Sequence, residues 1–155
     1  MRYNIPGTAK YVPIKFMDKS GTVGERPTST PVIMAALRYD TENFTGPRMV
    51  SIKRSWALLD TGAENNYATP DLIQAAGCPQ IGTAKIAGAT STIVSPHHHC
   101  KILFPEVGLQ LNTDVFAVPL AEQERHFPLI IGMLSIRQCR LVMDFKAEVY
   151  RLYIE

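Results

Sequence analysis

This 155-residue sequence has few cysteines, no long apolar run and no large excess of either charge. Its three cysteines, Cys78, Cys100 and Cys139, are odd in number and widely spaced. That pattern excludes a disulfide framework and favours a reducing compartment, which we expect to be the cytoplasm. No run approaches the roughly 20 apolar residues that cross a bilayer. The opening stretch MRYNIPGTAKYVPIKF also lacks the continuous apolar segment of a signal peptide.

The charges are almost balanced, with 16 lysines and arginines against 14 acidic residues and a formal net charge of +2. The densest basic patch, Lys53–Arg54, is too short for a nucleic-acid-binding arm, so no nucleic-acid partner is expected. Hydrophobic residues make up 46% of the chain, which suits one domain with a substantial core. The sequence contains neither a fixed-period repeat nor a low-complexity segment.

Residues 1–30 differ from the remainder because they are rich in proline, glycine, serine and threonine. This composition predicts an extended arm or a loosely packed segment, with one short strand at KYVPIKF. Three roles are open for the arm: it adds a strand, it covers a cleft, or it is a pro-segment that is removed. Residues 31–155 are expected to form the folded domain.

The rest of the chain is predicted to be mostly β-structure, because apolar and β-branched residues recur in short runs between turn residues. Three of these runs indicate single strands, and three longer segments indicate hairpins. The single strands are expected at 30–40, 48–60 and 127–134, and the hairpins at 83–96, 100–119 and 140–155.

Helices are expected to be few and short. The segment TPDLIQAAG, residues 69–77, has Thr69 as an N-cap, Pro70 at the first helical position and Gly77 as a stop. One or two further helical turns are predicted at 134–140. The expected fold class is therefore all-β with one or two short helices.

One aspartate lies in an unusual place. In the stretch RSWALLDTGAENN, Asp60 follows an apolar strand and precedes a turn of small residues. Burying a carboxylate there is costly unless hydrogen bonds compensate, and the Thr61 hydroxyl and the Gly62 and Ala63 amides are near enough to donate them. The same residues also suit an Asx turn that simply closes the strand. The local stretch alone therefore leaves both a turn former and a catalyst open.

A second stretch downstream favours the catalyst. FPLIIGMLSIRQCRLVMDF, residues 127–145, contains an apolar strand, a glycine and a short helix, and the hairpin KIAGATSTIV, residues 85–94, lies between it and Asp60. LLDTGA and LIIG in this order resemble the retroviral-type, or retropepsin-like, aspartic proteases over roughly residues 30–145. The resemblance implies a small closed barrel-like lobe whose flap hairpin covers a peptide-cleaving site.

The resemblance also implies a role for each matching residue. Asp60 is the expected catalytic aspartate, and Thr61 is expected to brace the two active-site loops against each other. Gly62 and Ala63 are expected to flank the substrate. The expected flap tip consists of Gly88, Ala89 and Thr90. The expected apolar strand behind the catalytic loop consists of Ile130, Ile131 and Gly132.

Peptide hydrolysis of this kind needs two carboxylates on one water, one as general base and one, protonated, as donor to the scissile carbonyl. The sequence holds a single Asp-Thr-Gly, because neither Asp114 nor Asp144 is followed by Thr or Ser and then Gly. The second aspartate must then come from a second copy. This predicts a C2 homodimer that cuts extended peptides, with no metal or organic cofactor required.

The sequence departs from the family pattern beside both motifs. The family often carries Gly-Arg-Asp or Gly-Arg-Asn after Ile-Ile, and its Arg pairs with a carboxylate just after Asp-Thr-Gly-Ala. Here Met133 and Leu134 stand in those places, so Glu64 lacks that ion pair. These differences motivate an alternative, a non-catalytic module that keeps the fold and binds an extended peptide or an adaptor protein.

The stretch SPHHHCK, residues 95–101, is a second conspicuous feature. Three histidines and a cysteine can bind zinc or copper. On a strand, however, His97 and His99 would face one way and His98 and Cys100 the other. The favoured interpretation is an exposed strand end, and a metal-binding β domain is kept as a minor alternative.

Overall fold

The computed structural model describes residues 7, 9–39, 53–87, 91–120 and 127–154. In order along the chain, the first strands and helix are β1 (Tyr11–Pro13), β2 (Lys15–Met17), β3 (Val23–Gly24), β4 (Thr30–Arg38), β5 (Ser55–Leu59), β6 (Asn66–Ala68) and α1 (Pro70–Ala76). They are followed by β7 (Gln80–Ala87), β8 (Thr92–Phe104), β9 (Leu109–Ala117), β10 (Leu129–Ile131), α2 (Met133–Ile136), β11 (Cys139–Asp144) and β12 (Val149–Ile154).

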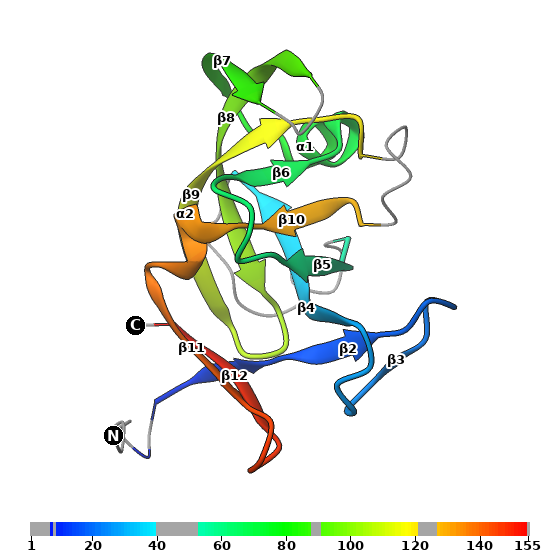
Figure 1. Cartoon of the computed structure of the whole chain (residues 1–155). Coiled ribbons are helices and arrows are strands. Elements are labelled where there is room, and N and C mark those ends of the chain that lie inside the picture. The colour runs from blue at the N-terminus through cyan, green and yellow to red at the C-terminus, as the bar shows by residue number, and fades with distance from the viewer. Residues whose placement is uncertain (1–6, 8, 40–52, 88–90, 121–126, 155) are drawn as a thin grey trace.

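The strands form two sheets (Figure 1). The smaller sheet has the order β1-β12-β11, and the larger has the order β3-β2-β4-β5-β10-β6-β9-β8-β7. The larger sheet curves round until β4 also pairs with β8, which gives a barrel-like ring. The prediction of a mostly-β fold with short helices is confirmed. In the described part of the chain, neither helix is long and apolar enough to cross a membrane.

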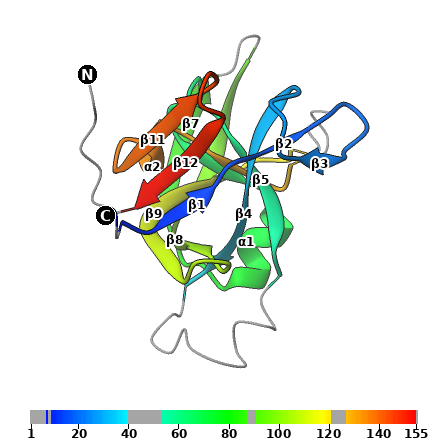
Figure 2. The same cartoon turned by 90° about the horizontal axis from the view of Figure 1, so that it is seen from below.

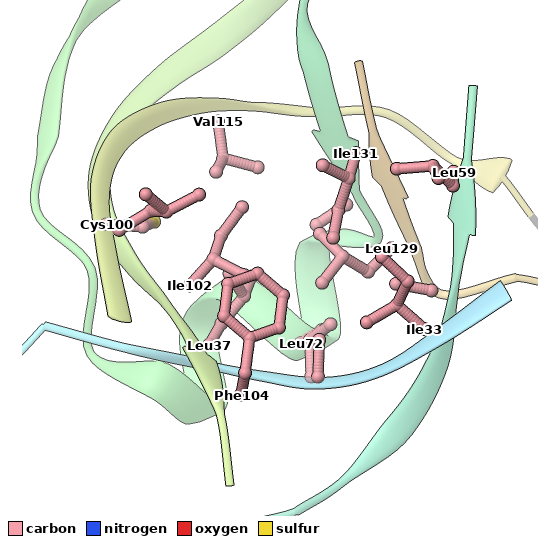
Figure 3. Packing of buried hydrophobic residues seen from close by; sticks show 14 of the residues in the cluster. Ile33, Leu37, Leu59, Leu72, Cys100, Ile102, Phe104, Val115, Leu129 and Ile131 are labelled. Atoms are coloured by element: carbon pink, nitrogen blue, oxygen red, sulfur yellow. The ribbon is translucent and has the colours of Figure 1, made fainter. Parts of the chain in front are cut away.

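Apolar side chains from the ring fill its interior. From below, the strands surround this interior, with β1 beside β12 (Figure 2). Successive residues of a strand point to opposite faces, so each strand directs only alternate side chains inward. These inward side chains come from strands that are far apart in the sequence. Figure 3 shows several of them packed together, among them Ile33, Ile102, Phe104, Leu129 and Ile131.

Helix α1 lies where it was predicted. The Thr69 hydroxyl accepts a long hydrogen bond of 3.4 Å from the Leu72 amide, and Gly77 ends the helix with a left-handed φ of 68°. Leu72 and Ile73 are its buried face. The helix therefore plugs one side of the ring with two apolar residues while its caps satisfy the terminal backbone groups.

One correction concerns β8, where the sequence predicted two separate hairpins. A single strand of 13 residues runs through the expected break and pairs with β7, β9 and β4. Local turn residues did not interrupt it, because β9 pairs with residues 97–104 and so spans the expected break, satisfying the backbone groups there. The β7–β8 hairpin, where the flap is expected, is thus an extension of a core strand.

The N-terminal arm is packed more tightly than its composition suggested. Strand β1 pairs with β12, and β2 pairs with β4, so the arm contributes to both sheets. Val12, Ile14 and Phe16 are each at most 4% exposed and belong to the main core. The arm adds strands, and its removal as a pro-segment stays a prediction.

We predict that Phe16→Ala lowers the free energy of unfolding by about 3 kcal/mol, because it removes a buried ring that packs edge-on against Tyr150. Lys19→Ala, an exposed change in the same arm, should alter stability by less than about 0.5 kcal/mol. Urea unfolding of both variants measures the difference. A near-neutral Phe16→Ala would mean that the arm does not pack on the domain in solution.

Candidate active site

Asp60 lies at the point where two central parallel strands end together. Strand β5 pairs with β10 so that Leu59 is opposite Ile131, and the next amide, that of Asp60, donates to the Ile131 carbonyl at 2.9 Å. Ile130 is opposite Leu58 in the same ladder. Asp60 is half-buried. The expected apolar strand and the expected catalytic loop are therefore direct neighbours.

Its carboxylate is held by the turn that follows. The Gly62 amide donates to Asp60 Oδ1 at 2.9 Å, and a Cβ on Gly62 would lie only 3.2 Å from that oxygen. The Ala63 amide, expected to bind the carboxylate too, donates instead to the main-chain carbonyl of Asp60 at 3.2 Å. The geometry is an Asx turn. The Gly62 amide binds only Oδ1, so it does not bind the second carboxylate oxygen of Asp60.

Two backbone hydrogen bonds clamp the loop to the start of α2. The Met133 amide donates to the Ala63 carbonyl and the Leu134 amide donates to the Glu64 carbonyl, both at 2.8 Å. Gly132 makes this approach feasible, because a Cβ there would lie 2.1 Å from the Asn65 carbonyl oxygen. Main-chain bonds thus hold the two segments together at the place where the family uses an arginine side chain.

A buried polar cluster centred on Asn66 supports the loop from beneath. Its Oδ1 accepts from the Gly132 amide at 3.0 Å. Its Nδ2 lies within hydrogen-bonding distance of Thr113 Oγ1 at 2.9 Å, Ser135 Oγ at 2.8 Å and the Asp114 carbonyl at 3.1 Å. Asn66 and Ser135 have no exposed surface. Because a buried polar group without partners is costly, this cluster fixes how β6, β9 and α2 meet.

Sequence reasoning missed both Asn66 and the short strand β6 that carries it. The polar residues after the Asp60 turn showed no strand alternation, and no pattern distinguished Asn65 from Asn66. Strand β6 forms because it lies between β10 and β9, pairing antiparallel with the first and parallel with the second. Both of these partners are distant in the sequence, so local signals could not reveal it.

A cleft of about 610 Å³ opens beside Asp60 and Gly62. The loop forms one wall, and the part of the β7–β8 hairpin next to its tip forms another. Part of its lining is apolar and belongs to a second small core cluster. The large aliphatic residues of the lining are Ile86, Ile93, Val118, Leu120 and Ile130. The expected flap tip, Gly88, Ala89 and Thr90, lies outside the described residues.

The histidine stretch lies in the middle of β8, so the interpretation as an exposed strand end was wrong. The alternation of faces is confirmed: Cys100 is fully buried, whereas His97 and His99 face Asp114 on β9. His99 Nδ1 lies 3.0 Å from Asp114 Oδ1, and His97 Nε2 lies 3.1 Å from Oδ2 without hydrogen-bond alignment. Over the described ranges, no set of three or more metal-ligating side chains is arranged around a common point.

A comparison with solved structures identifies which known fold this arrangement of strands resembles. The crystal structure of a retropepsin-like aspartic protease from Rickettsia conorii is similar to this chain, with a TM-score of 0.56 over 99% of this chain and 98% of the other. The fold is retropepsin-like. The two sequences are 12% identical, so the likeness is one of architecture. No protein-family model and no curated protein matches the sequence.

The close packing of the loop against the start of α2 requires a glycine at position 132. We therefore predict that Gly132→Ala lowers the free energy of unfolding by about 3 kcal/mol. The added methyl group would overlap the Asn65 and Ala63 carbonyls. Gly24→Ala is the matched control, because a Cβ there meets nothing within 4 Å, and it should be nearly neutral. Equal stability of the two variants in urea unfolding would show that the loop does not hold this approach.

Proposed function

We propose that this chain is an aspartic endopeptidase in which Asp60 is the catalytic carboxylate. The observation that carries the proposal is the position of Asp60. It lies at the end of β5, its carboxylate held by the Gly62 amide at 2.9 Å, on the wall of a cleft of about 610 Å³ in a retropepsin-like fold. An Asx turn with only a structural role would not require a hairpin and a cleft beside it.

The proposed chemistry uses two copies of Asp60 on one water molecule. The ionised carboxylate takes a proton from the water as the oxygen attacks the scissile carbonyl. The protonated carboxyl of the other copy donates a hydrogen bond to that carbonyl, and a proton then passes to the leaving amine. The Gly62 amide restrains one carboxylate oxygen, which leaves the other to face the water.

The second carboxylate is proposed to come from a homodimer partner. Thr61 and Gly62 are exposed on the single chain, although they follow the half-buried Asp60 directly. A surface that carries the reactive loop and remains open is one that a second copy can cover across a two-fold axis. In that arrangement Thr61 would brace the two loops against each other.

The proposed substrate is an extended peptide with apolar side chains beside the cut bond. The cleft offers apolar contacts from Ile86 and Ile93 on the hairpin and from Val118 and Leu120 opposite. An extended peptide can also form main-chain hydrogen bonds to a hairpin as an added strand. Ala63 would flank the peptide backbone.

The second candidate function is a module that binds a peptide or an adaptor without cutting it. It is favoured by the absence of the family's arginine at Met133. The backbone bonds from Met133 and Leu134 to the loop make that side chain unnecessary for holding the loop in place. They do not replace its charge at a dimer interface, so weak pairing of copies would leave a binding cleft without chemistry.

We predict that Asp60→Asn lowers peptide cleavage by at least about 10³-fold while the protein stays folded, because the amide cannot act as general base. Glu64→Gln, an equally conservative change in the same cleft, should retain most activity. Cleavage of a mixed peptide library, followed by mass spectrometry from roughly pH 3 to 7.5, measures both. Undiminished cleavage by Asp60→Asn would overturn the proposal, and a folded native chain that binds peptides uncut would favour the module.

Mixing the native chain with Asp60→Asn tests the shared site. If two copies supply the carboxylates, equal amounts that exchange freely leave about a quarter of the dimers with both aspartates. Activity should then fall to about one quarter of that of the same total amount of native chain, rather than one half. Light scattering on the mixture confirms the assembly, and a result of one half would place the whole site in a single chain.

A further inference from the structure

Two cysteines lie directly opposite each other at the base of the hairpin. In the ladder between β7 and β8, Gln80 is the partner of His98. The pairing continues one step beyond β7, because the His99 amide donates to the Pro79 carbonyl at 3.2 Å. The next step in the same register sets Cys78 against Cys100 across the strands.

The spacing at such a position suits a disulfide. Since residues 79 and 99 form the hydrogen-bonded pair, the following pair is of the non-hydrogen-bonded kind, whose Cα atoms are about 4.5 Å apart. A disulfide needs Cα atoms about 4.4–6.8 Å apart. Cys78 is 8% exposed and Cys100 is 0% exposed, and both are free thiols in this structure. A second contact, His98 Nδ1 at 3.0 Å from the Cys78 carbonyl, holds the two segments together.

We propose that Cys78 and Cys100 are a redox-active pair that a peroxide converts into an intramolecular disulfide. This inference does not rest on the proposed protease activity. The abundance of reductant in the expected compartment makes such a bond transient, as redox-sensing disulfides in reducing compartments are.

The pair has both an entry path and a defined attacking sulfur. Cys78 lines a second cavity of about 880 Å³, which lets a small oxidant reach it. The neighbouring Cys100 thiol, as a hydrogen-bond donor, lowers the pKa of Cys78, whereas its own pKa is raised by the same contact and by burial. Cys78 is therefore the sulfur that reacts first.

The reaction balances with one peroxide for each disulfide. The Cys78 thiolate attacks one peroxide oxygen, the O–O bond breaks, and the sulfur becomes a sulfenic acid while water leaves. The Cys100 sulfur then attacks that sulfenic acid, loses its proton and expels a second water. Two thiols are oxidised, and one peroxide is reduced to two waters.

The bond would tie the end of α1 to β8 and close a loop of roughly 20 residues that contains the whole outer hairpin. Such a link limits how far the hairpin base can open, because β7 begins just after Cys78. Ile93 lines both this cavity and the cleft beside Asp60. Oxidation at the hairpin base is therefore positioned to change access to that cleft.

The test is stoichiometric oxidation of the native chain with hydrogen peroxide, followed by thiol counting and non-reducing peptide mapping. We expect two of the three thiols to disappear together. Trypsin should then release residues 55–85 joined to 86–101, and dithiothreitol should separate them. The peptide that holds Cys139 should keep its free thiol, because burial raises the pKa of Cys139 to about 11.

Two variants complete the test. Cys139→Ser should leave the linked peptide unchanged, whereas Cys78→Ser should abolish it and leave Cys100 as a free thiol. The thermal midpoint of the oxidised native chain should rise by several degrees relative to the reduced form, and that rise should be absent in Cys78→Ser. Three persisting thiols, a link through Cys139, or only sulfinic acid on Cys78 would overturn the inference.

Discussion

The close approach of the loop after Asp60 to the junction of β10 and α2 is the constraint on which the rest of the site depends. Only a residue without a side chain fits at Gly132, where carbonyl oxygens of the loop occupy the space of a Cβ. That closeness lets two α2 amides bond the loop from one side and Asn66 bond Gly132 from the other. The loop that carries the aspartate is thereby held mainly by main-chain hydrogen bonds, which do not depend on the rotamer of a surface side chain.

The cleft forms because β8 belongs both to the ring and to the hairpin. Its C-terminal half is part of the ring and pairs with β4 and β9, while its N-terminal half projects with β7 as the hairpin. The projecting hairpin lines the cleft beside Asp60 with Ile86 and Ile93, close to the hairpin tip, whereas its root lies in the core strand. The same root carries Cys100 and brings it opposite Cys78, which places a chemically sensitive pair where the hairpin meets the core.

The incompleteness of the single chain is central to the proposed function. One carboxylate with one restrained oxygen cannot both remove a proton from water and donate a hydrogen bond to a carbonyl. The exposed Thr61 and Gly62 give a second copy a surface to meet. Under the proposed function, a lobe with a single Asp-Thr-Gly is a half-site, and the interface between copies would decide whether it becomes an enzyme or remains a binding module.

Much of the fold was accessible from the sequence, because short-range chemistry specified it. Thr69, Pro70 and Gly77 marked the helix, and apolar runs between turn residues marked β4, β10 and the closing hairpin. The joint appearance of LLDTGA and LIIG predicted which strands would be neighbours. The helix caps and the strand alternation depend on residues a few positions apart and are visible in one dimension, whereas the contact between the two distant motifs was implied by the family resemblance.

What only the tertiary structure decided depends on partners distant in the chain. Asn66 became a hub because β6 lies between β9 and β10, and nothing local distinguished it from Asn65. The arm became core because β12 and β4 offered free edges to β1 and β2. The His97–Cys100 stretch became the middle of a strand for the same reason. The sequence by itself determined helix α1, several strands and the motif around Asp60, whereas long-range pairing determined strand β6, the continuity of β8 and burial, because these belong to the assembled ring.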